Sequence, residues 1–337
     1  MKEPKVCVLM STYNGEKYLR EQIDSILKQT QVDAQLIVRD DGSSDGTVRI
    51  LEEYSRNYPN VSFYRGTNVG VGKSFLELLK NAPQADYYSF ADQDDVWLED
   101  KLNHAVSIIR QIEQKDTTGL RGEEYVITGL KREELLYSDH TSSVPVLYGS
   151  NQTLVDAELV EIGRHYQKPP KCDLYNCMSR NCFYGCTMVL NSALRDIYLT
   201  LPEPSEKVLA RKNHDGWILY CALINGIVVY EHSSRILYRQ HANNVVGGKK
   251  LRGLSLYKDK WNRLVSGKNK GLRSELAKDL ITCYEGALDE KTLHDLMILS
   301  DANSVNGIIK LLQNREIVDS FNEKEVFIFL RGMLRWI

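Results

Sequence analysis

Three carboxylates stand close together at Asp92, Asp94 and Asp95, at the end of a segment, residues 86–95, that has the composition of a buried strand. Two carboxylates at positions i and i+2 can meet one hard cation where the chain turns. Proteins usually hold Mg²⁺ or Mn²⁺ with one or two carboxylates and the phosphates of a substrate. The pattern therefore indicates a metal–diphosphate site. The alternative is a solvated acidic turn that caps a helix beginning near Leu98.

The elements that must position these acids alternate between strand and helix over the first hundred residues, which indicates β-α-β units around a parallel sheet. In such a sheet, ligands bind outside the carboxyl ends of the strands. Polar motifs follow three of the four predicted strands, so the sequence predicts one binding surface at that edge. The predicted strands span residues 6–11, 34–41, 61–65 and 86–95, the helices residues 18–29, 48–58 and 74–82, and the motifs residues 11–14, 40–43 and 92–95.

A phosphate-binding P-loop is a rival interpretation for the segment Gly70-Val71-Gly72-Lys73-Ser74, which lies between a predicted strand and a predicted helix. A P-loop needs a glycine five residues before its Gly-Lys-Ser. Position 67 is threonine, and the nearest glycine, Gly66, comes one residue too early. We therefore interpret the segment as a glycine turn that begins a helix.

The composition is that of a folded domain, because 42% of the 337 residues are hydrophobic and 26% are charged. The 43 Lys and Arg against 45 Asp and Glu leave a formal charge of −2, so no overall field favours nucleic acid. No stretch approaches the ~18 apolar residues of a spanning helix, and the short apolar run at the amino terminus is unlike a signal peptide. These features predict a cytoplasmic protein that does not bind nucleic acid.

The cysteines raise the question of zinc. Seven cysteines, an odd number without an export signal, predict reduced thiols rather than a disulfide framework. Structural zinc sites prefer paired cysteines about two to four residues apart, and the four clustered cysteines here show no clear pairing. Buried thiols are the favoured interpretation, and zinc stays the alternative. The clustered residues are Cys172, Cys177, Cys182 and Cys186.

Four motifs, in this order and spacing, resemble the inverting family 2 glycosyltransferases with a GT-A fold: VCVLMSTYNGEKYLREQIDSILKQT, LIVRDDGSSDGT, NVGVGKSF and ADQDDVWLEDKL. The later stretches GCTMVLN, HDGWILY and YRQHANNVVG resemble the bacterial rhamnosyltransferase-like branch. The resemblance covers roughly residues 4–247. It implies an α/β fold with a mostly parallel central sheet flanked by helices. The implied division is residues 1–114 for the nucleotide-sugar and 115–247 for the acceptor, and the Lys-rich helical composition of residues 248–337 predicts a helical extension outside the resemblance.

The resemblance implies a nucleotide-sugar site at the polar edge. In relatives, the Ser-Thr-Tyr-Asn loop and the second aspartate of Asp-Asp-Gly-Ser hold the nucleotide. Many relatives place an arginine where this chain has Lys73, which can still meet a phosphate as a point charge. The alternative for residues 13–15 is a loop that only caps a helix. The implied nucleotide-sugar-binding residues are Ser11, Thr12, Tyr13, Asn14, Asp41, Lys73, Asp92 and Gln93.

The resemblance also implies a metal site. Asp92 and Asp94 match the family's Asp-x-Asp, with Asp94 the better ligand for Mg²⁺ or Mn²⁺ and Asp92 also reaching the ribose. Asp95 would orient the turn. His241 resembles a late histidine that contacts the metal or diphosphate in some relatives, and its alternative is a structural role. Arg239 would offset phosphate charge.

A single inverting displacement needs a base on the acceptor side and a neutralised diphosphate on the other. Asp215 matches the position where relatives carry their catalytic carboxylate, at the start of a helix. The alternative is a helix cap, and both roles can coexist. His214 would either tune the site or only pack.

These features predict an inverting transfer of a sugar, with rhamnose the leading candidate, from a UDP- or dTDP-sugar to a hydroxyl of a bacterial surface polysaccharide or lipid-linked glycan. A nucleotidyltransferase that makes activated sugars is an alternative, although residues 15–17 form a poor triphosphate loop. A non-catalytic nucleotide-sugar-binding protein is another. The segments 249–275 and 326–337 indicate peripheral contact with an anionic membrane, or else helices packed on the domain.

Overall fold

The computed structural model describes residues 2–137, 143–180, 182, 184–241, 271–321, 328 and 332. The chain forms two compact units. The first comprises Met1–Cys177, Asn181–Leu201 and Lys212–Arg239, and the second Met178–Arg180, Pro202–Arg211 and Gln240–Ile337. The predicted boundary after residue 247 lies outside the described residues, so that boundary stays a prediction.

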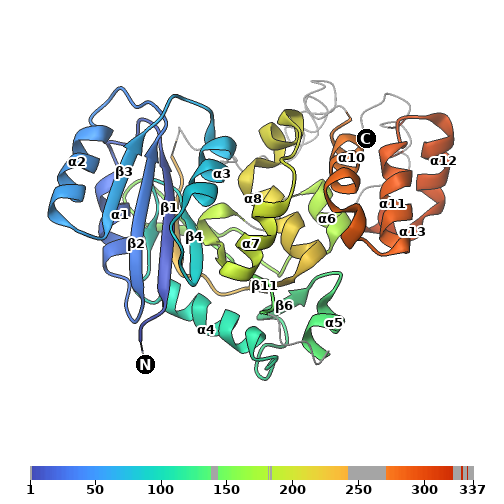
Figure 1. The fold of residues 1–337 in the computed structure, drawn as a ribbon, viewed down its shortest axis with the longest axis horizontal. Coiled ribbons are helices and arrows are strands. Elements are labelled where there is room, and N and C mark those ends of the chain that lie inside the picture. The colour runs from blue at the N-terminus through green and yellow to red at the C-terminus, as the bar shows by residue number, and fades with distance from the viewer. Residues whose placement is uncertain are drawn as a thin grey trace. The chain divides into compact units, whose positions relative to one another are not determined.

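An eight-stranded sheet with the strand order β3-β2-β1-β4-β10-β7-β11-β6 forms the centre of the first unit. Its first four strands are parallel to one another, which confirms the expected β-α-β units. Figure 1 shows these strands side by side in blue and cyan. They are β1 (Lys5–Thr12), β2 (Asp33–Asp40), β3 (Val61–Arg65) and β4 (Tyr87–Ala91).

The other half of the sheet starts with β10, which is antiparallel to both β4 and β7. Strand β11 is parallel to β7 and antiparallel to β6, so four of the seven pairings in this mixed sheet are parallel. A second sheet has the order β5-β12-β8-β9. The bounds are β5 (Val96–Trp97), β6 (Tyr125–Thr128), β7 (Val146–Ser150), β8 (Thr153–Val155), β9 (Glu161–Arg164), β10 (Val189–Asn191), β11 (Ile227–Glu231) and β12 (Ile236–Arg239).

Helices flank the large sheet, and α1 buries one face. In α1, the residues Leu19, Ile23 and Ile26 recur at helical spacing and join a core that includes Val8 and Met10 of β1. Helix α8 (Glu206–Asn225) is broken at Asn213, and its residues 214–224 are buried on all sides. The others are α1 (Leu19–Leu27), α2 (Thr47–Asn57), α3 (Val71–Asn81), α4 (Lys101–Glu113), α5 (Arg132–Tyr137), α6 (Leu174–Ser179), α7 (Ser192–Thr200) and the short turn η1 (Gly185–Thr187).

The second unit contains the expected carboxyl-terminal helices. Side chains cap two of them: Asp289 accepts the N–H of Thr292 at 2.8 Å at the start of α11, and Ser304 accepts the N–H of Gly307 at 2.9 Å at the start of α12. The helices are α10 (Leu272–Tyr284), α11 (Glu290–Ser300), α12 (Val305–Gln313) and α13 (Arg315–Ser320), with the turn η2 (Glu285–Ala287).

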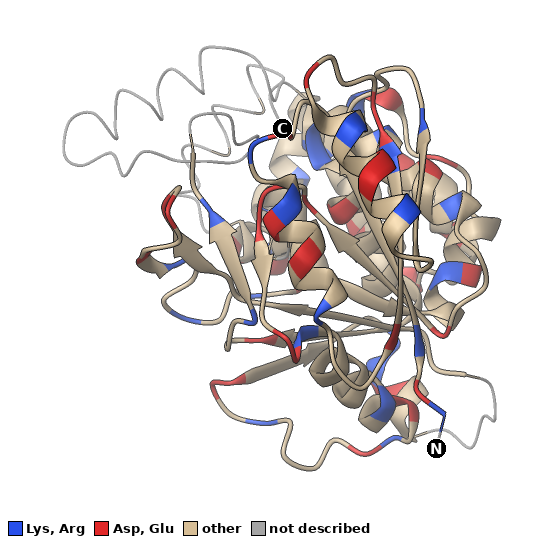
Figure 2. Ribbon diagram, turned by 90° about the vertical axis from the view of Figure 1, so that its left-hand side faces the viewer, with Lys and Arg blue, Asp and Glu red and all other residues tan. Residues whose placement is uncertain are grey.

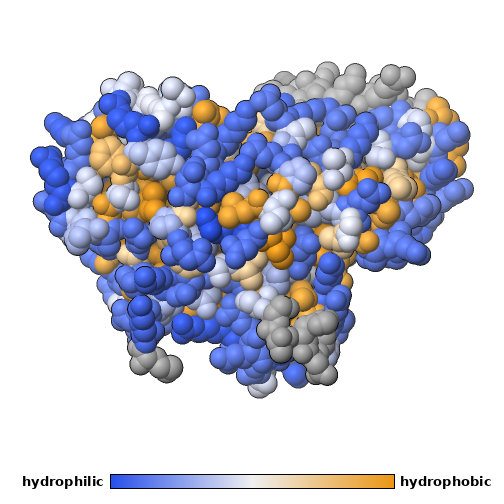
Figure 3. Space-filling view, in the orientation of Figure 1, coloured by the Kyte–Doolittle hydropathy of each residue, from blue (hydrophilic) through white to orange (hydrophobic). Residues whose placement is uncertain are grey.

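The surface mixes charges of both signs. Lys and Arg are interspersed with Asp and Glu along the elements in Figure 2, in keeping with the formal charge of −2. Hydrophobic residues are likewise scattered among hydrophilic ones on the face drawn in Figure 3. None of the helices that the structure describes is long and apolar enough to cross a membrane. Of the segments predicted to contact a membrane, residues 249–270 and most of residues 326–337 lie outside the described part of the chain.

Candidate active site

The carboxyl ends of β1, β2 and β4 bring the three polar motifs to one edge of the large sheet. The register pairs Thr12 with Asp40, and β4 lies on the other side of β1. Across this edge, the backbone N–H of Tyr13 donates to Gln93 Oε1 at 2.9 Å, and Gln93 Nε2 donates to the Tyr13 carbonyl at 3.1 Å. These two bonds tie the loop after β1 to the acidic turn after β4.

The loops after β1 and β2 are also tied together. The backbone N–H of Asn14 donates to Ser43 Oγ at 2.9 Å, and the N–H of Gly46 donates to Glu16 Oε2 at 2.7 Å. The ring of Tyr13 projects from this framework and is 50% exposed. An exposed ring on a fixed loop suits the predicted role of Tyr13 in binding the nucleotide-sugar, because an aromatic ring can stack on a base.

Thr12 and Asp40 lie buried beneath these loops and support them. The Thr12 hydroxyl donates to Asp40 Oδ1 at 3.1 Å, and the N–H groups of Gly42 and Ser43 donate to Asp40 Oδ2 at 3.2 and 2.9 Å. Both Thr12 and Asp40 are fully buried. Thr12, which the sequence predicts to contact the nucleotide, therefore shapes the loop and presents no side-chain surface in this structure.

The carboxylate of Asp41 holds the loop that precedes α3. It pairs with the guanidinium of Arg39, and it accepts the N–H groups of Val69 and Gly70 at 3.0 Å each. Asp41 is 3% exposed. The amide groups at the glycine turn thus bond a carboxylate of the protein. In a P-loop, these amides would be open to bind a phosphate. This favours the interpretation of the Gly-Val-Gly-Lys-Ser segment as a turn that begins a helix.

Two other predicted nucleotide contacts lie on and beside this loop. The hydroxyls of Ser11 and Ser74 are 2.6 Å apart, and Arg39 Nη1 donates to Ser74 Oγ at 3.3 Å. Lys73 lies in the first turn of α3 with an exposed side chain. Ser11 is therefore part of the loop framework, whereas Lys73 has the exposure that a phosphate contact requires.

The acidic turn forms a close group with a cysteine. One ligand atom each from Asp92, Asp95 and Cys186 lies within 4.8 Å of the others. Asp95 is fully buried, and its Oδ2 has no hydrogen-bond partner among the described residues. Burial, reinforced by neighbouring carboxylates, raises the pKa of Asp92 to about 7 and that of Asp95 well above its usual range. A divalent cation would relieve this repulsion and satisfy the orphan oxygen, so these residues fit a metal.

Arg239 braces the acidic turn from β12. Its backbone N–H donates to Asp95 Oδ1 at 3.1 Å, and its Nε donates to the carbonyl of Asp94 at 2.9 Å. Its Nη2 donates to Glu21 at 2.6 Å, and the side chain is 1% exposed. Arg239 is therefore a buried brace, and the predicted contact with phosphate would have to replace these bonds. His241 belongs to the second unit, so its predicted metal ligation stays a prediction.

Asp215 lies directly after the break in α8. At Asn213 the backbone has φ 52 and ψ −171, so a new helical segment starts there, and Asp215 Oδ1 accepts the N–H of Gly216 at 2.8 Å. Asp215 is 7% exposed, and burial raises its pKa to about 6. Its charge also contributes to the raised pKa of Asp92. The predicted base therefore lies near the acidic turn, although the two are more than a hundred residues apart in sequence.

Residues 7–158 match the family model described as glycosyl transferase family 2. This part of the chain is therefore a family 2 glycosyltransferase domain. A curated relative, dTDP-rhamnosyl transferase RfbG of Shigella flexneri, is 29% identical over 287 residues, which cover 80% of this chain and 82% of the relative. An uncharacterized glycosyltransferase, RP339 of Rickettsia prowazekii, is 24% identical over 310 residues, 92% of this chain and 83% of the relative.

Solved structures agree with the expected GT-A fold. The crystal structure of S. aureus TarS residues 1–349 in complex with UDP-GlcNAc has a TM-score of 0.53 and 18% identity, and the match covers 97% of this chain and 81% of that one. The complex of the same protein with UDP has a TM-score of 0.55 and 17% identity, over 98% of this chain and 81% of that one. The expected fold is therefore confirmed.

His214 is a packing residue of this glycosyltransferase. Its ring stacks on Phe75 at 4.0 Å between centroids and meets the edge of Phe90 at 4.9 Å. Neither ring nitrogen has a hydrogen-bond partner in the part of the chain that the structure describes. Burial lowers the pKa of His214 to about 3, so the imidazole is neutral. Of the two predicted roles, packing is the one that these contacts support.

The cysteines of the glycosyltransferase are all free thiols, as the sequence predicts. Within the predicted cluster, the sulfurs of Cys177 and Cys182 are 3.4 Å apart. Burial and neighbouring thiols keep the pKa of Cys177 well above its usual range. Within the described residues, the group that could hold a metal consists of Cys186, Asp92 and Asp95. It does not include the Cys177–Cys182 pair.

Lys101 is a residue near the site that sequence reasoning missed. It is 3% exposed, its Nζ lies 3.6 Å from the centre of the Trp97 ring, and it donates to Ser89 Oγ at 3.4 Å. Burial lowers the pKa of Lys101 to about 7, while the charges of Cys186 and Asp95 act in the opposite direction. A lysine within ten residues of an acidic turn in sequence is too common to single out, so only the fold reveals this buried neighbour.

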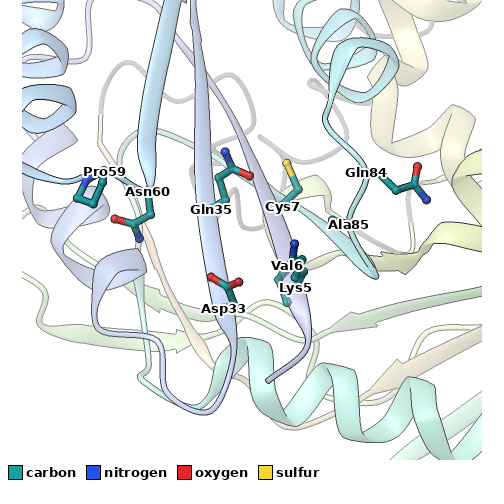
Figure 4. A pocket seen from close by; sticks show the side chains of 9 residues that line it. All are labelled: Lys5, Val6, Cys7, Asp33, Gln35, Pro59, Asn60, Gln84 and Ala85. Carbon is teal, nitrogen blue, oxygen red and sulfur yellow. The ribbon is translucent and has the colours of Figure 1, made fainter. Parts of the chain in front are cut away.

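A pocket of about 310 Å³ lies elsewhere on the glycosyltransferase. Figure 4 shows that it is lined by the starts of β1 and β2, including Lys5, Cys7, Asp33 and Gln35, together with Asn60 and Gln84. This is the amino end of the parallel strands, opposite to the edge that carries the acidic turn. The pocket therefore contributes nothing to the candidate active site.

Proposed function

We propose that this glycosyltransferase transfers a sugar, with inversion, from a UDP- or dTDP-sugar to a hydroxyl of a bacterial surface polysaccharide or lipid-linked glycan. The observation that carries the proposal is that the η1 turn joins a buried carboxylate, Asp215, to the acidic turn. A Cβ placed on Gly185 would lie 3.5 Å from Asp215 Cβ, and the next residue, Cys186, lies in the close group with Asp92 and Asp95. An inverting displacement needs one group to take the hydroxyl proton and another site to hold the departing diphosphate.

The donor would bind along the edge formed by the loops after β1, β2 and β4. The exposed ring of Tyr13 would stack on the base, and Lys73 would meet a phosphate. The structurally similar TarS was crystallised in complex with UDP-GlcNAc, which supports a nucleotide-sugar donor. The similarity to the dTDP-rhamnosyl transferase RfbG supports dTDP-rhamnose as the donor.

A divalent cation would be held by Asp92 and Asp95, with Cys186 as a neighbour and Asp94 as a further, half-buried carboxylate. Bound there, Mg²⁺ or Mn²⁺ supplies charge that stabilises the leaving diphosphate. The orphan Oδ2 of Asp95 supports this assignment. His241 is proposed as an additional ligand on the strength of the resemblance alone.

Asp215 would act as the general base. The acceptor oxygen forms a bond to the anomeric carbon, the bond from that carbon to the diphosphate oxygen breaks, and the hydroxyl proton passes to the Asp215 carboxylate. The backbone N–H of Gly216 donates to Asp215 Oδ1 at 2.8 Å, and the backbone N–H of Gly185 also bonds this carboxylate, so the proposed base is held in place. A buried base with a pKa of about 6 is ionised near neutral pH and still basic enough to accept the proton.

A thermal-shift screen of nucleotide-sugars with Mg²⁺ or Mn²⁺ tests the donor, because a ligand that binds only the folded state raises the unfolding midpoint. Transfer assays with that donor then test the reaction. Release of a nucleoside diphosphate supports the proposal, whereas release of pyrophosphate would favour the nucleotidyltransferase alternative. Nucleotide binding without turnover against any acceptor would favour the non-catalytic alternative.

We also propose peripheral membrane contact, on the cytoplasmic face, through residues 249–275 and 326–337, where a lipid-linked acceptor would lie. Flotation with anionic liposomes compares the full chain with a chain that ends at residue 248. Equal flotation of the two proteins would contradict the membrane contact and leave the transferase reaction unaffected.

A further inference from the structure

We propose that Tyr184 and His165 form a binding subsite for a pyranose ring of the acceptor, beside Asp215. The inference rests on the proposed function, because it names the chemical class that the acceptor side recognises. Sugar rings combine apolar C–H faces with hydroxyls, and sites for them need aromatic surface with a few fixed polar groups. This pair of side chains offers both.

The two rings form one polar aromatic surface. Tyr184 Oη and His165 Nε2 are 3.0 Å apart, and the ring centroids are 4.6 Å apart at an angle of 63°. Tyr166 meets His165 edge to face, with 4.6 Å between centroids. All three rings are half-buried, so each keeps part of its surface open. A ligand there meets ring faces together with a hydroxyl and an imidazole.

Buried amides hold the histidine side of this surface in place. The N–H of His165 donates to the carbonyl of Gln152 at 3.0 Å, and Asn151 bonds both the N–H and the carbonyl of Tyr166, at 3.0 and 2.8 Å. Asn151 and Gln152 are each 1% exposed. The surface is therefore pre-organised, which lowers the entropy lost when a ligand binds.

The tyrosine side connects directly to the candidate active site. The residue after Tyr184 is Gly185, and a Cβ placed on it would lie 3.5 Å from Asp215 Cβ. The next residue, Cys186, belongs to the close group with Asp92. Tyr184 thus starts a three-residue segment whose other members contact the proposed base and the proposed metal group. A sugar on the Tyr184 ring would therefore lie beside the segment that contacts Asp215, where the proposed reaction needs its acceptor.

The hydroxyl of Tyr184 is suited to a neutral polyol. Burial raises the pKa of Tyr184 to about 12, and the charge of Asp215 acts in the same direction, so the phenol keeps its proton at physiological pH. Burial lowers the pKa of His165, which keeps its imidazole neutral. Neutral hydrogen-bonding groups on aromatic rings match sugar hydroxyls better than they match a phosphate.

Saturation-transfer NMR on the full chain, with Mg²⁺ and UDP or dTDP present, tests the subsite with three probes: methyl α-L-rhamnopyranoside, methyl β-D-glucopyranoside and methyl β-D-galactopyranoside. We expect ring C–H signals from at least one probe with the wild-type protein. Tyr184→Ala and His165→Ala should each weaken these signals at least fivefold. Tyr184→Phe, which keeps the ring, should retain more signal than Tyr184→Ala. The control is Tyr137→Ala, because Tyr137 is 75% exposed on α5.

Absence of signal from all three probes with wild-type protein would overturn the subsite, and so would equal signals from wild type and Tyr184→Ala. Unfolding midpoints without ligand identify a variant that fails to fold, in which case Tyr184→Phe and His165→Ala decide the outcome. The nucleotide-induced thermal shift of the wild type separates the two proposals. A missing nucleotide shift contradicts the proposed function, whereas a normal nucleotide shift with unchanged saccharide signals contradicts only the subsite.

Discussion

Gly185 lies so close to His214 that a Cβ added to the glycine would be 2.5 Å from the imidazole Nε2. The imidazole has little room to move away, because it stacks on Phe75 and meets the edge of Phe90 in the core. The helical segment that carries Asp215 starts at Asn213, the residue before His214. The spacing of the proposed base from the η1 turn is therefore set by the absence of a side chain at position 185.

The substitution Gly185→Ala should accordingly destabilise the protein and displace Asp215. Overpacking of this kind costs about 1 to 3 kcal/mol, and a displaced base should reduce transfer at least tenfold. Urea unfolding and initial-rate assays measure the two effects. Gly286→Ala is the matched control, since a Cβ there meets no atom within 4 Å. Wild-type activity in Gly185→Ala would contradict the packing argument.

The pH dependence of transfer should report Asp215. Burial raises its pKa to about 6 in the ligand-free protein, and a base must be ionised, so kcat/KM at a saturating cation concentration should rise with pH below about 6 and level off above it. Asp215→Asn keeps the shape of the side chain and removes the base, so it should lower kcat by about 10²- to 10⁴-fold. Donor binding by Asp215→Asn, measured by thermal shift, should change little. A profile that is flat from pH 5 to 8 would assign the base elsewhere.

The acidic turn should make stability fall as pH rises. Asp92 has a pKa of about 7 in the folded protein, against about 3.9 for an unfolded aspartate, so the unfolded chain loses this proton first. The free energy of unfolding should therefore decrease between about pH 4 and 7 when no divalent cation is present, by on the order of a few kcal/mol. Mg²⁺ or Mn²⁺ should restore much of the loss.

Asp95→Asn tests the same group of residues. The amide carries no charge, so the variant should be more stable than wild type near pH 8 without metal and should gain less stability from Mn²⁺. Asp196→Asn, at an exposed position on α7, is the control and should behave as wild type. Thermal unfolding at pH 5 and 8, with and without Mn²⁺, measures all of these effects. An identical response of Asp95→Asn and wild type to Mn²⁺ would remove Asp95 from the metal site.

The framework of the site could be predicted from the sequence because it depends on local patterns. The alternation of strand and helix periods fixes a parallel sheet, and parallel register brings the loops at Tyr13 and Asp92 to one edge. The family motifs then add Asp215, which lies near that edge in the structure. Each of these steps needs only residues close together in sequence, or a fold that the motifs already specify.

The remaining details depend on contacts between distant residues, which no periodicity encodes. The pairing of Asp41 with Arg39 and the loop at Gly70 shows only after the chain folds, and so does the burial of Lys101. Arg239 illustrates the same limit. A sequence places an arginine beside the site, but only the packing shows that its guanidinium is 1% exposed and bonded to Glu21.

The break in α8 offers a test of how backbone conformation positions the base. Asn213 has φ 52 and ψ −171, a region that glycine occupies readily and other residues rarely. Asn213→Gly should therefore leave stability unchanged or raise it by up to about 1 kcal/mol, whereas Asn213→Ala should lower it by about 1 to 2 kcal/mol. Chemical denaturation of both variants measures this order. If Asn213→Ala proves the more stable variant, the break is not held by backbone strain at this residue, and the position of Asp215 must be set by the η1 turn alone.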